Sequence, residues 1–360
     1  MSRSRSPRPT LSRVAATAGV SQSTASLVFS GAGPVSAETR RRVLDAAAEV
    51  GYTGPNPLAR SLRQGRSGIV GVLIGERLLY AFRDPVAVAL LDGLTEELAP
   101  AGFALLLLSG SSGRVGPSPE QVASTPLDAV VVESCGGRDE PALTALQNRG
   151  VPLVVVEGPQ VPDVPSVHID NHGASAELTR HLLELGHRRI SVVTLPLRQP
   201  GMHSGWLTDA HQELASAPIC LDRLRGVEEA AGRRVPAFEA GSGLIEDGLR
   251  AGHEVLAAEP RPTAVVAQSD LLAVGVIQAA RERGLRVPED LSVVGFDGID
   301  TPWLSPLRLT TVEQPMTGKG RAAGRMVVEL LSGGDPGGER MPTTVRAGTT
   351  SAPAPELLDE

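Results

Sequence analysis

The pattern of apolar and polar positions predicts two short helices around a tight turn near the start of the chain. Val14, Ala15 and Ala18 recur at helical spacing and form an apolar stripe on the first helix. Gly19 follows, and a residue without a side chain adopts the left-handed helix exit at little cost. Ser21 suits the N-cap of the second helix. The pattern is typical of a helix-turn-helix.

The second of these helices separates an apolar face from a polar one within the segment Leu11–Ser30. Ala25, Val28 and Phe29 turn inward by helical periodicity. The outward positions near the helix start, where side chains reach base edges in a major groove, are Gln22, Ser23, Thr24 and Ser26. An ordinary helical hairpin has the same outline, so the pattern alone leaves that alternative open.

Two neighbouring features favour a DNA-binding headpiece over a hairpin. A third helix is predicted over 36–50, with Ser36 as N-cap and Gly51 just past its end. It carries a cluster of three arginines, and a basic arm precedes the whole segment. These arginines are Arg40, Arg41 and Arg42 in the helix, and Arg3, Arg5 and Arg8 in the arm.

From residue 69 onward, short apolar runs alternate with helical segments. This alternation predicts a doubly wound α/β fold with parallel sheets, whose ligands bind at the carboxyl ends of the strands. The predicted strands are 69–74, 103–108, 129–134, 153–158, 190–195, 263–268 and 291–296. The predicted helices are 85–99, 141–149, 175–185 and 271–283. The stretch 196–218 breaks the rhythm, so we expect a loop there that marks a boundary between lobes.

Charge is divided unequally between the two ends of the chain. The 360 residues carry a formal charge of -7, from 34 Lys and Arg against 41 Asp and Glu. Residues 1–66 hold ten Arg and three acidic residues, which leaves a net charge of -14 on the remainder. A basic module on an acidic body is typical of phosphate contact at one end only. We therefore expect double-stranded DNA as a partner of the N-terminal module.

Several classes of protein find no support in the sequence. There is no phosphate loop, nucleophile elbow or zinc-protease motif, so we expect no enzyme and no cofactor. His168 and His172 lack a partner at metal-ligand spacing, and structural histidines are the favoured reading. Cys135 and Cys220 are too few for a disulfide scaffold. With no apolar run of membrane-spanning length and no signal peptide, we expect a cytoplasmic, nucleoid-associated protein.

Six motifs in order carry a resemblance to a known family. They are TLSRVAATAGVS, VSAETRRRVLDAAAEVGY, PNPLARSL, LGHRRISVV, SDLLAVGVIQAARERGLRVPEDLSVVGFDG and LTTVEQP. This series resembles the LacI/GalR family of bacterial transcriptional regulators over residues 10–350. The resemblance implies a homodimer, with an all-α helix-turn-helix headpiece (1–53), a hinge helix and linker (54–68), and a two-lobe effector-binding and dimerisation domain (69–350) like periplasmic binding proteins. We expect a disordered tail over 351–360.

The family pattern also implies chain crossings and DNA contacts. Residues near 299–330 are expected back in the first lobe, and a last strand near 345–350 in the second. Base-reading positions of the family fall on Gln22, Ser23 and Ser26–Leu27, with Leu27 where the family commonly has Arg. The resemblance assigns Thr24 and Ser26 to phosphates and Leu62 to a minor-groove wedge that kinks the duplex. The alternative for Leu62 is packing against the linker.

The ligand is expected in the cleft between the lobes. Arg223 matches a family position that binds ligand hydroxyls or a carboxylate. Asp270 and Asp297 lie at the ends of predicted strands, where polar side chains enter the cleft, and are therefore candidates for ligand contact. Asp270 could instead cap the helix that begins at Leu271. The chain has few aromatic residues, and three of them lie in two loops that follow predicted strands. This placement favours stacking on a ring-shaped ligand, with packing between the lobes as the alternative. The remaining candidates in these loops are Tyr80, Phe82, Asp84 and Trp303.

Together these features predict a sequence-specific regulator, in its simplest form a repressor, whose operator affinity is controlled by a small molecule. A sugar or a related metabolite is the expected effector, bound between the lobes. The alternative is a small-molecule-binding protein with a degenerate headpiece and no role at DNA. Departures from the family at Leu27 and in the hinge keep this alternative open.

Overall fold

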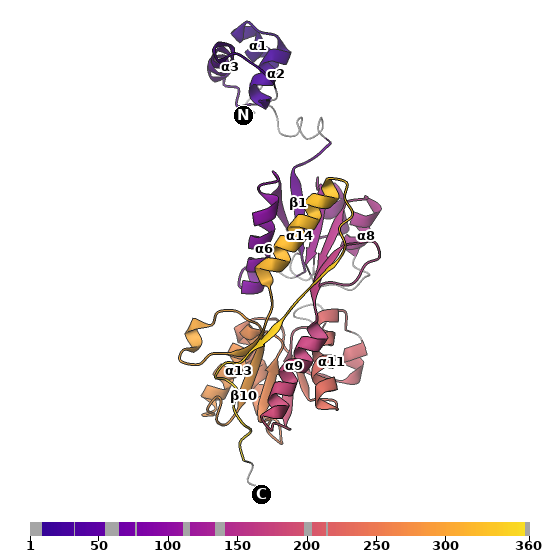
Figure 1. The fold of residues 1–360 in the computed structure, drawn as a ribbon, viewed down its shortest axis with the longest axis vertical. Coiled ribbons are helices and arrows are strands. Elements are labelled where there is room, and N and C mark those ends of the chain that lie inside the picture. Colours follow the sequence, from indigo (N-terminus) through magenta and orange to yellow (C-terminus); the bar gives the residue numbers. More distant parts are fainter. Residues whose placement is uncertain are drawn as a thin grey trace, which may run out of the picture. The chain divides into compact units, whose positions relative to one another are not determined.

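The structure, a computed structural model, describes residues 9–31, 33–54, 65–75, 78–110, 116–133, 141–197, 204–213 and 215–356 (Figure 1). The chain divides into two compact units, Met1–Ser67 and Gly68–Glu360. We call the first unit the headpiece and the second the body. Leu62, the basic arm and the predicted hinge helix lie outside the described residues.

The headpiece contains the three predicted helices. They are α1 (Leu11–Ala18), α2 (Gln22–Ser30) and α3 (Ala37–Val50). Val14, Ala25, Val28 and Val43 are buried among them and form its core. Gly19 adopts φ 64°, in the left-handed region that ends α1, as predicted. The local pattern of apolar residues and caps therefore accounts for this unit.

The body holds two sheets, each covered by helices on both faces, so the predicted doubly wound architecture is confirmed (Figure 1). The first lobe is a six-stranded parallel sheet in the order β12-β5-β4-β3-β1-β2. Its strands are β1 (Ile69–Ile74), β2 (Ala104–Ser109), β3 (Ala129–Glu133), β4 (Leu153–Val156), β5 (Ser166–Ile169) and β12 (Glu339–Met341). Its helices are α5 (Leu78–Ala81), α6 (Pro85–Leu98), α7 (Pro119–Ser124), α8 (Pro141–Asn148) and α14 (Met316–Leu331).

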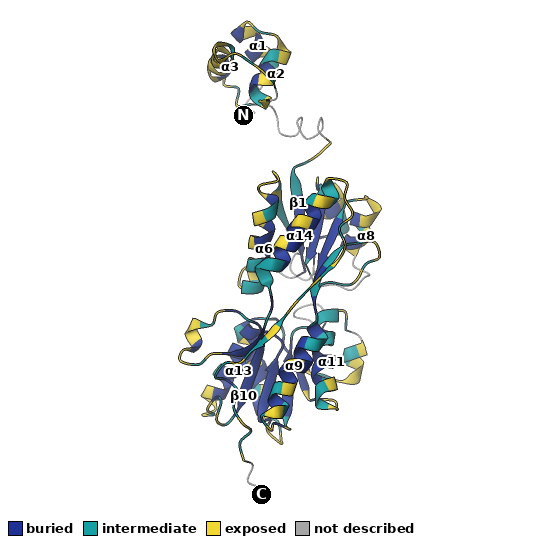
Figure 2. Ribbon diagram, in the orientation of Figure 1, coloured by how far each residue is buried: buried dark blue, intermediate teal, exposed yellow. Residues whose placement is uncertain are grey.

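The second lobe is a seven-stranded sheet in the order β13-β11-β10-β9-β6-β8-β7, antiparallel only at its two edges. Its strands are β6 (Ile190–Thr194), β7 (Gly205–Trp206), β8 (Ala237–Glu239), β9 (Ala264–Ala267), β10 (Ser292–Asp297), β11 (Thr310–Glu313) and β13 (Thr344–Arg346). Its helices are α9 (Asn171–Glu184), α10 (Asp209–Glu213), α11 (Pro218–Ala231), α12 (Ile245–Leu256), α13 (Asp270–Glu282) and the 3-10 turn η1 (Pro302–Leu304). The strands of both lobes are mostly buried and the helices expose their outer faces (Figure 2).

The chain passes between the lobes three times. It leaves the first sheet after β5 and enters α9, returns between β11 and α14, and leaves again between β12 and β13. The expectation that residues from 299 onward lie in the first lobe is therefore wrong for 299–313, because β11 pairs with β10. The return occurs at Gln314 and Pro315, and only α14 packs on the first lobe.

Two further expectations need correction. The stretch 196–218 is no lobe boundary, because β6 before it and β7 within it belong to the same sheet. Residues 351–354 do not belong to a disordered tail, since Ala352 accepts a hydrogen bond from His187 and the Ala354 amide donates to Leu185 O. The stretch 196–218 looked like a loop because β7 has only two residues and α10 only five.

Helix pairs that carry the site residues approach closely because glycine lies at each contact. A Cβ on Gly93 of α6 would collide with the backbone of Thr317 in α14, and one on Gly226 of α11 with that of His172 in α9. Any larger residue would force these helices apart. The glycines thereby fix the positions of α9, α11 and α14 at the crossings between the lobes.

Candidate DNA-reading surface and ligand cavity

The polar face of α2 lies on the outside of the headpiece, opposite its buried face. Gln22, Ser23 and Leu27 are exposed, while Thr24 and Ser26 are partly buried. The Ser21 hydroxyl accepts a hydrogen bond from the Thr24 amide at 3.0 Å and caps the helix. The Thr24 and Ser23 hydroxyls also lie 2.8 and 2.7 Å from the Ser21 hydroxyl. The first turn of α2 is thus fixed by local hydrogen bonds.

The arginine cluster of α3 serves the fold of the headpiece as well as its charge. Arg42 donates to the carbonyl of Ala18 and so ties α3 to the turn after α1. Arg40 donates to the carbonyl of Val28 at the end of α2, at 3.4 Å. All three arginines of the cluster are exposed, as is Arg13 on α1. Arg40 therefore connects α3 to α2, and Arg42 connects α3 to the end of α1.

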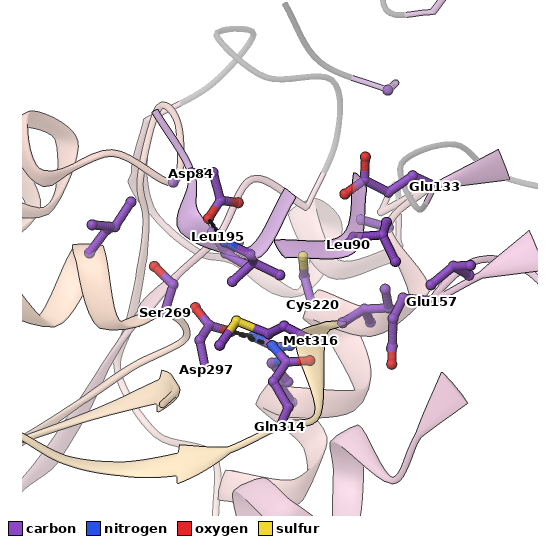
Figure 3. A pocket seen from close by; sticks show the side chains of 18 of the residues that line it. Asp84, Leu90, Glu133, Glu157, Leu195, Cys220, Ser269, Asp297, Gln314 and Met316 are labelled. Atoms are coloured by element: carbon purple, nitrogen blue, oxygen red, sulfur yellow. Dashed lines mark hydrogen bonds and ion pairs between the residues drawn. The ribbon is translucent and has the colours of Figure 1, made fainter. Parts of the chain in front are cut away.

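In the body, a cavity of about 190 Å³ opens at the carboxyl ends of strands from both lobes (Figure 3). First-lobe segments supply Asp84, Glu133 and Glu157, and second-lobe segments supply Arg223 and Asp297. Apolar side chains fill much of the remaining wall. They include Val86, Leu90, Val156, Leu195, Ile219, Leu271 and Met316. No aromatic residue is among the described residues that line the cavity.

Six polar side chains, five of which line this cavity, form a closed ring of hydrogen bonds and ion pairs. We call it the polar ring; its members are Glu157, Asn171, Arg223, Asp297, Gln314 and Lys319. Each lobe contributes one ion pair. Lys319 Nζ lies 3.1 Å from Glu157 Oε1 in the first lobe, and Arg223 Nη1 lies 3.8 Å from Asp297 Oδ1 in the second.

Two amides connect these ion pairs across the lobes. Asn171 donates to Glu157 Oε2 at 2.8 Å and accepts from Arg223 Nε at 2.9 Å. Gln314 donates to Asp297 Oδ1 at 2.6 Å and accepts from Lys319, and the first of these bonds is drawn in Figure 3. Both amides lie where the chain crosses between the lobes. A change in lobe orientation would have to stretch or exchange these bonds.

Backbone conformation directs two of the ring carboxylates. Glu157 follows β4 with φ 51°, and Asp297 ends β10 with φ 127°. Residues other than glycine rarely adopt such values, and such strain clusters at functional sites.

Arg223 lies over the Phe296 ring, 3.6 Å from its centroid, and also donates to the carbonyl of Gln268. Packing from every side thus immobilises the guanidinium.

Three carboxyl groups that line the cavity, those of Asp84, Glu133 and Asp297, have raised pKa values, which favours their neutral forms. Burial, followed by the negative charge of Asp84, raises the pKa of Glu133 to about 7 against the opposing effect of Lys319. Burial likewise raises the pKa of Asp84 and of Asp297, although Arg223 opposes it in both cases. Carboxyls in this state both donate and accept hydrogen bonds.

The structure brings together three of the seven predicted ligand residues, namely Asp84, Arg223 and Asp297. Phe82 and Trp303 are exposed, 60% and 51% respectively, and lie outside the cavity wall. Tyr80 packs with Leu244, Leu271 and Ile299 of the second lobe, so lobe packing accounts for its position. The aromatic residues therefore offer no stacking platform in this cavity.

Asp270 lies outside the cavity wall, and it does not cap α13. It is fully buried and absent from the cavity wall, and Ser269 caps α13 by accepting from the Leu272 amide. The Asp270 carboxylate instead accepts from the Gly298 and Ile299 amides, both at 2.8 Å, and from the Thr311 hydroxyl at 2.6 Å. Burial raises its pKa to about 7. Asp270 thus holds the loop behind Asp297 in place.

Sequence reasoning missed several cavity residues for which signals exist. Glu133 and Glu157 end apolar runs just as Asp297 does, so the same rule would select them. Lys319 is the single lysine in a chain whose other basic residues are arginines. Gln314 and Asn171 carry no such signal, because their roles depend on where the chain crosses between lobes.

The part of the chain that the structure describes contains no candidate metal site, reactive thiol or membrane-spanning helix. There, no three His, Cys, Asp or Glu side chains are placed to hold a metal ion. Cys220 is a buried free thiol, and burial raises its pKa to about 11, which makes it unreactive. Within the same residues, no helix has the length and apolar character needed to cross a bilayer.

Comparisons with known proteins match both units of the chain. Residues 10–56 match the family described as bacterial regulatory proteins, lacI family, and residues 179–351 match a periplasmic binding protein-like domain. A helix-turn-helix transcriptional regulator of Mycolicibacterium smegmatis is 36% identical, covering 97% of this chain and 99% of its own.

Two solved structures are similar over nearly the whole chain. A LacI-family regulator from Corynebacterium glutamicum has a TM-score of 0.71 at 29% identity, covering 96% of this chain and all of its own. A complex of the transcriptional regulator CelR with cellobiose has a TM-score of 0.67 at 29% identity and the same coverage. The similarity therefore extends through the headpiece and both lobes.

Proposed function

The chain belongs to the LacI family of bacterial transcriptional regulators, and we propose that it binds an operator through the exposed face of α2 while a small molecule in the cavity controls that binding. Transcriptional regulators of this kind are not enzymes, and we extend this to the present chain. We place its action on DNA of the nucleoid. The alternative of a degenerate headpiece is not favoured, since its core and all three N-caps are intact.

We propose roles for the headpiece residues on the basis of their placement. Gln22, Ser23 and Leu27 face outward on α2 and are assigned to base edges. Thr24 and Ser26, partly buried at the edge of that face, are assigned to phosphates. Leu62 keeps the wedge role that the family resemblance implies, as a prediction outside the described residues.

The observation that carries the proposal for the body is the polar ring at the base of a cavity shared by both lobes. A ligand that contacts Arg223 and Asp297 on one side and Asp84 on the other would bridge the lobes. Such contact would favour one lobe orientation over another. A coupling of about 1–3 kcal/mol changes operator affinity about 5- to 150-fold.

We infer a carbohydrate or a similar polyol as the effector. Carboxyl groups with raised pKa values and a guanidinium supply both donors and acceptors for hydroxyl groups. The cellobiose complex of the similar regulator CelR supports this class. We assign donor contacts to Arg223 and both donor and acceptor contacts to Asp84, Glu133 and Asp297.

We further propose that two copies bind a pseudo-palindromic operator as a homodimer. Leu79, Phe82 and Val88 expose large apolar side chains in and between α5 and α6. Apolar exposure of this kind is typical of a surface that is covered in an assembly.

Selection of operators from a randomised duplex library tests the proposed function. The full chain should enrich a two-fold symmetric sequence, and the affinity for that sequence should fall linearly in a plot of log affinity against log salt concentration. Enrichment of no sequence would contradict operator binding. Binding that is insensitive to salt would exclude the expected phosphate contacts.

A further inference from the structure

The outward face of α2 lacks the groups that usually read guanine. The nine residues Gln22–Ser30 contain no Lys, Arg, Asp or Glu. Specific contacts to G·C pairs are most often made by the forked donors of Arg or by Lys. Among the exposed residues of this helix, only Gln22 has a side chain that can form two parallel hydrogen bonds to one base.

Leu27 is a large apolar side chain on that outward face. It is 37% exposed, while Ala25 and Val28 turn into the headpiece core. Helical periodicity places Leu27 on the same side as Ser23 and Thr24, one turn further along α2. An exposed leucine on a surface that meets a groove offers van der Waals contact and no hydrogen bond. The group in the major groove that matches it is the 5-methyl of thymine.

The Leu27 side chain is held in place before any DNA binds. A Cβ on Gly33 would lie 3.2 Å from Leu27 Cδ2, so this leucine packs against the backbone of the loop after α2. The Leu27 carbonyl accepts from the Gly31 amide at 3.0 Å, which closes the helix at the left-handed Gly31. A fixed side chain loses little entropy on contact, so one methyl contact can discriminate between bases.

We propose that Leu27 reads the 5-methyl group of one thymine in each operator half-site. This inference rests on the proposed function, because it requires that α2 enter the major groove. It assigns a base preference where the family pattern commonly has an arginine. At that position of the half-site, the operator of this regulator carries an A·T pair.

Replacement of thymine by uracil tests the inference by removing only the methyl group. Each thymine of the selected operator is changed to uracil in turn, and affinity is measured with the full chain. At one thymine per half-site we expect about fourfold weaker binding, which corresponds to the ~0.8 kcal/mol of one buried methyl group. The other thymines should tolerate the change.

Two variants complete the cycle. Leu27→Ala should bind the thymine and uracil operators equally, since the partner of the methyl group is gone. Leu44→Ala is the matched control, because Leu44 is also an exposed leucine of the headpiece but lies on α3, and it should keep the fourfold difference. Unchanged affinity of Leu27→Ala for random duplex DNA would show that the headpiece remains folded.

Three results would overturn the inference while leaving operator binding intact. They are a half-site without thymine, equal affinity of the wild-type chain for every uracil-substituted operator, and a fourfold difference that persists in Leu27→Ala. Failure of the chain to enrich any sequence is a different outcome, which contradicts the proposed function itself and the inference with it.

Discussion

The reading face of α2 and the polar ring of the cavity are built in opposite ways. The reading face is exposed and uncharged, and neighbours three residues apart hold it, as the bond from the Thr24 amide to Ser21 shows. The polar ring is buried and charged, and its members lie as far apart in sequence as Glu157 and Lys319. A substitution in the first should act locally, whereas one in the second should act on the entire body.

The largest expected effect separates these two regions. Arg223→Met removes the cationic partner of Asp297 in a buried ion pair and the donor to the Asn171 side-chain carbonyl. We expect the free energy of unfolding of the body to fall by about 3–5 kcal/mol. Chemical denaturation followed by tryptophan fluorescence measures it, because Trp206 and Trp303 both lie in the second lobe.

Arg250→Met is the matched control for that change. Arg250 pairs with Asp247 on α12 of the same lobe, but its side chain is 66% exposed. Its loss should lower the free energy of unfolding by less than about 1 kcal/mol. Equal effects of the two variants would contradict the idea that the polar ring stabilises the body.

A pH-dependent effect is expected at the wall of the cavity. Because the pKa of Glu133 is raised to about 7 from an ordinary 4.5, the folded state binds more protons than the unfolded state between these values. The contribution of Glu133 to stability is therefore greatest at low pH and declines as pH rises through 7. Glu133→Gln should raise the free energy of unfolding by roughly 1–3 kcal/mol at pH 8 and change it little at pH 5.

Glu96→Gln provides a control of opposite sign. The hydrogen bond from Arg321 holds the pKa of Glu96 below its ordinary value of 4.5. The ionised carboxylate therefore stabilises the fold at pH values above 4.5, and this contribution is lost as the pH falls below the lowered pKa. The variant should be slightly less stable at pH 8 and equal to the wild type in acid. A Glu133→Gln variant that gains the same stability at both pH values would exclude ionisation of Glu133 as the cause.

The smallest expected effect concerns the headpiece. Ser21→Ala removes the N-cap of α2 and should cost about 1 kcal/mol of local stability. Amide hydrogen exchange of the full chain should be faster than in the wild type within α2 and unchanged in the body. Ser26→Ala, within the same helix, should not accelerate exchange, because alanine is the better helix former. Faster exchange throughout the chain after Ser21→Ala would contradict the local character of this region.

The same contrast explains what the sequence could predict. The helices of the headpiece and the seven strands predicted between residues 69 and 296 follow from local patterns of apolar residues and caps. The short strands β7, at the edge of its sheet, and β8, beside it, were not predicted, because two or three residues carry too little pattern. Asp84, Arg223 and Asp297 were predicted to bind the ligand and line the cavity, whereas Asn171 and Gln314 became visible only once the crossings between lobes were known.

The central claim is that a small molecule in the cavity controls how tightly the headpiece binds its operator. The most direct test measures operator affinity in the presence of each member of a panel of neutral mono- and disaccharides, with cellobiose among them. At least one sugar should change the affinity of the wild-type chain at least fivefold, and Arg223→Met, measured under conditions in which it is folded, should show no such change. If no sugar changes the affinity, or if the variant responds as the wild type does, the claim is contradicted.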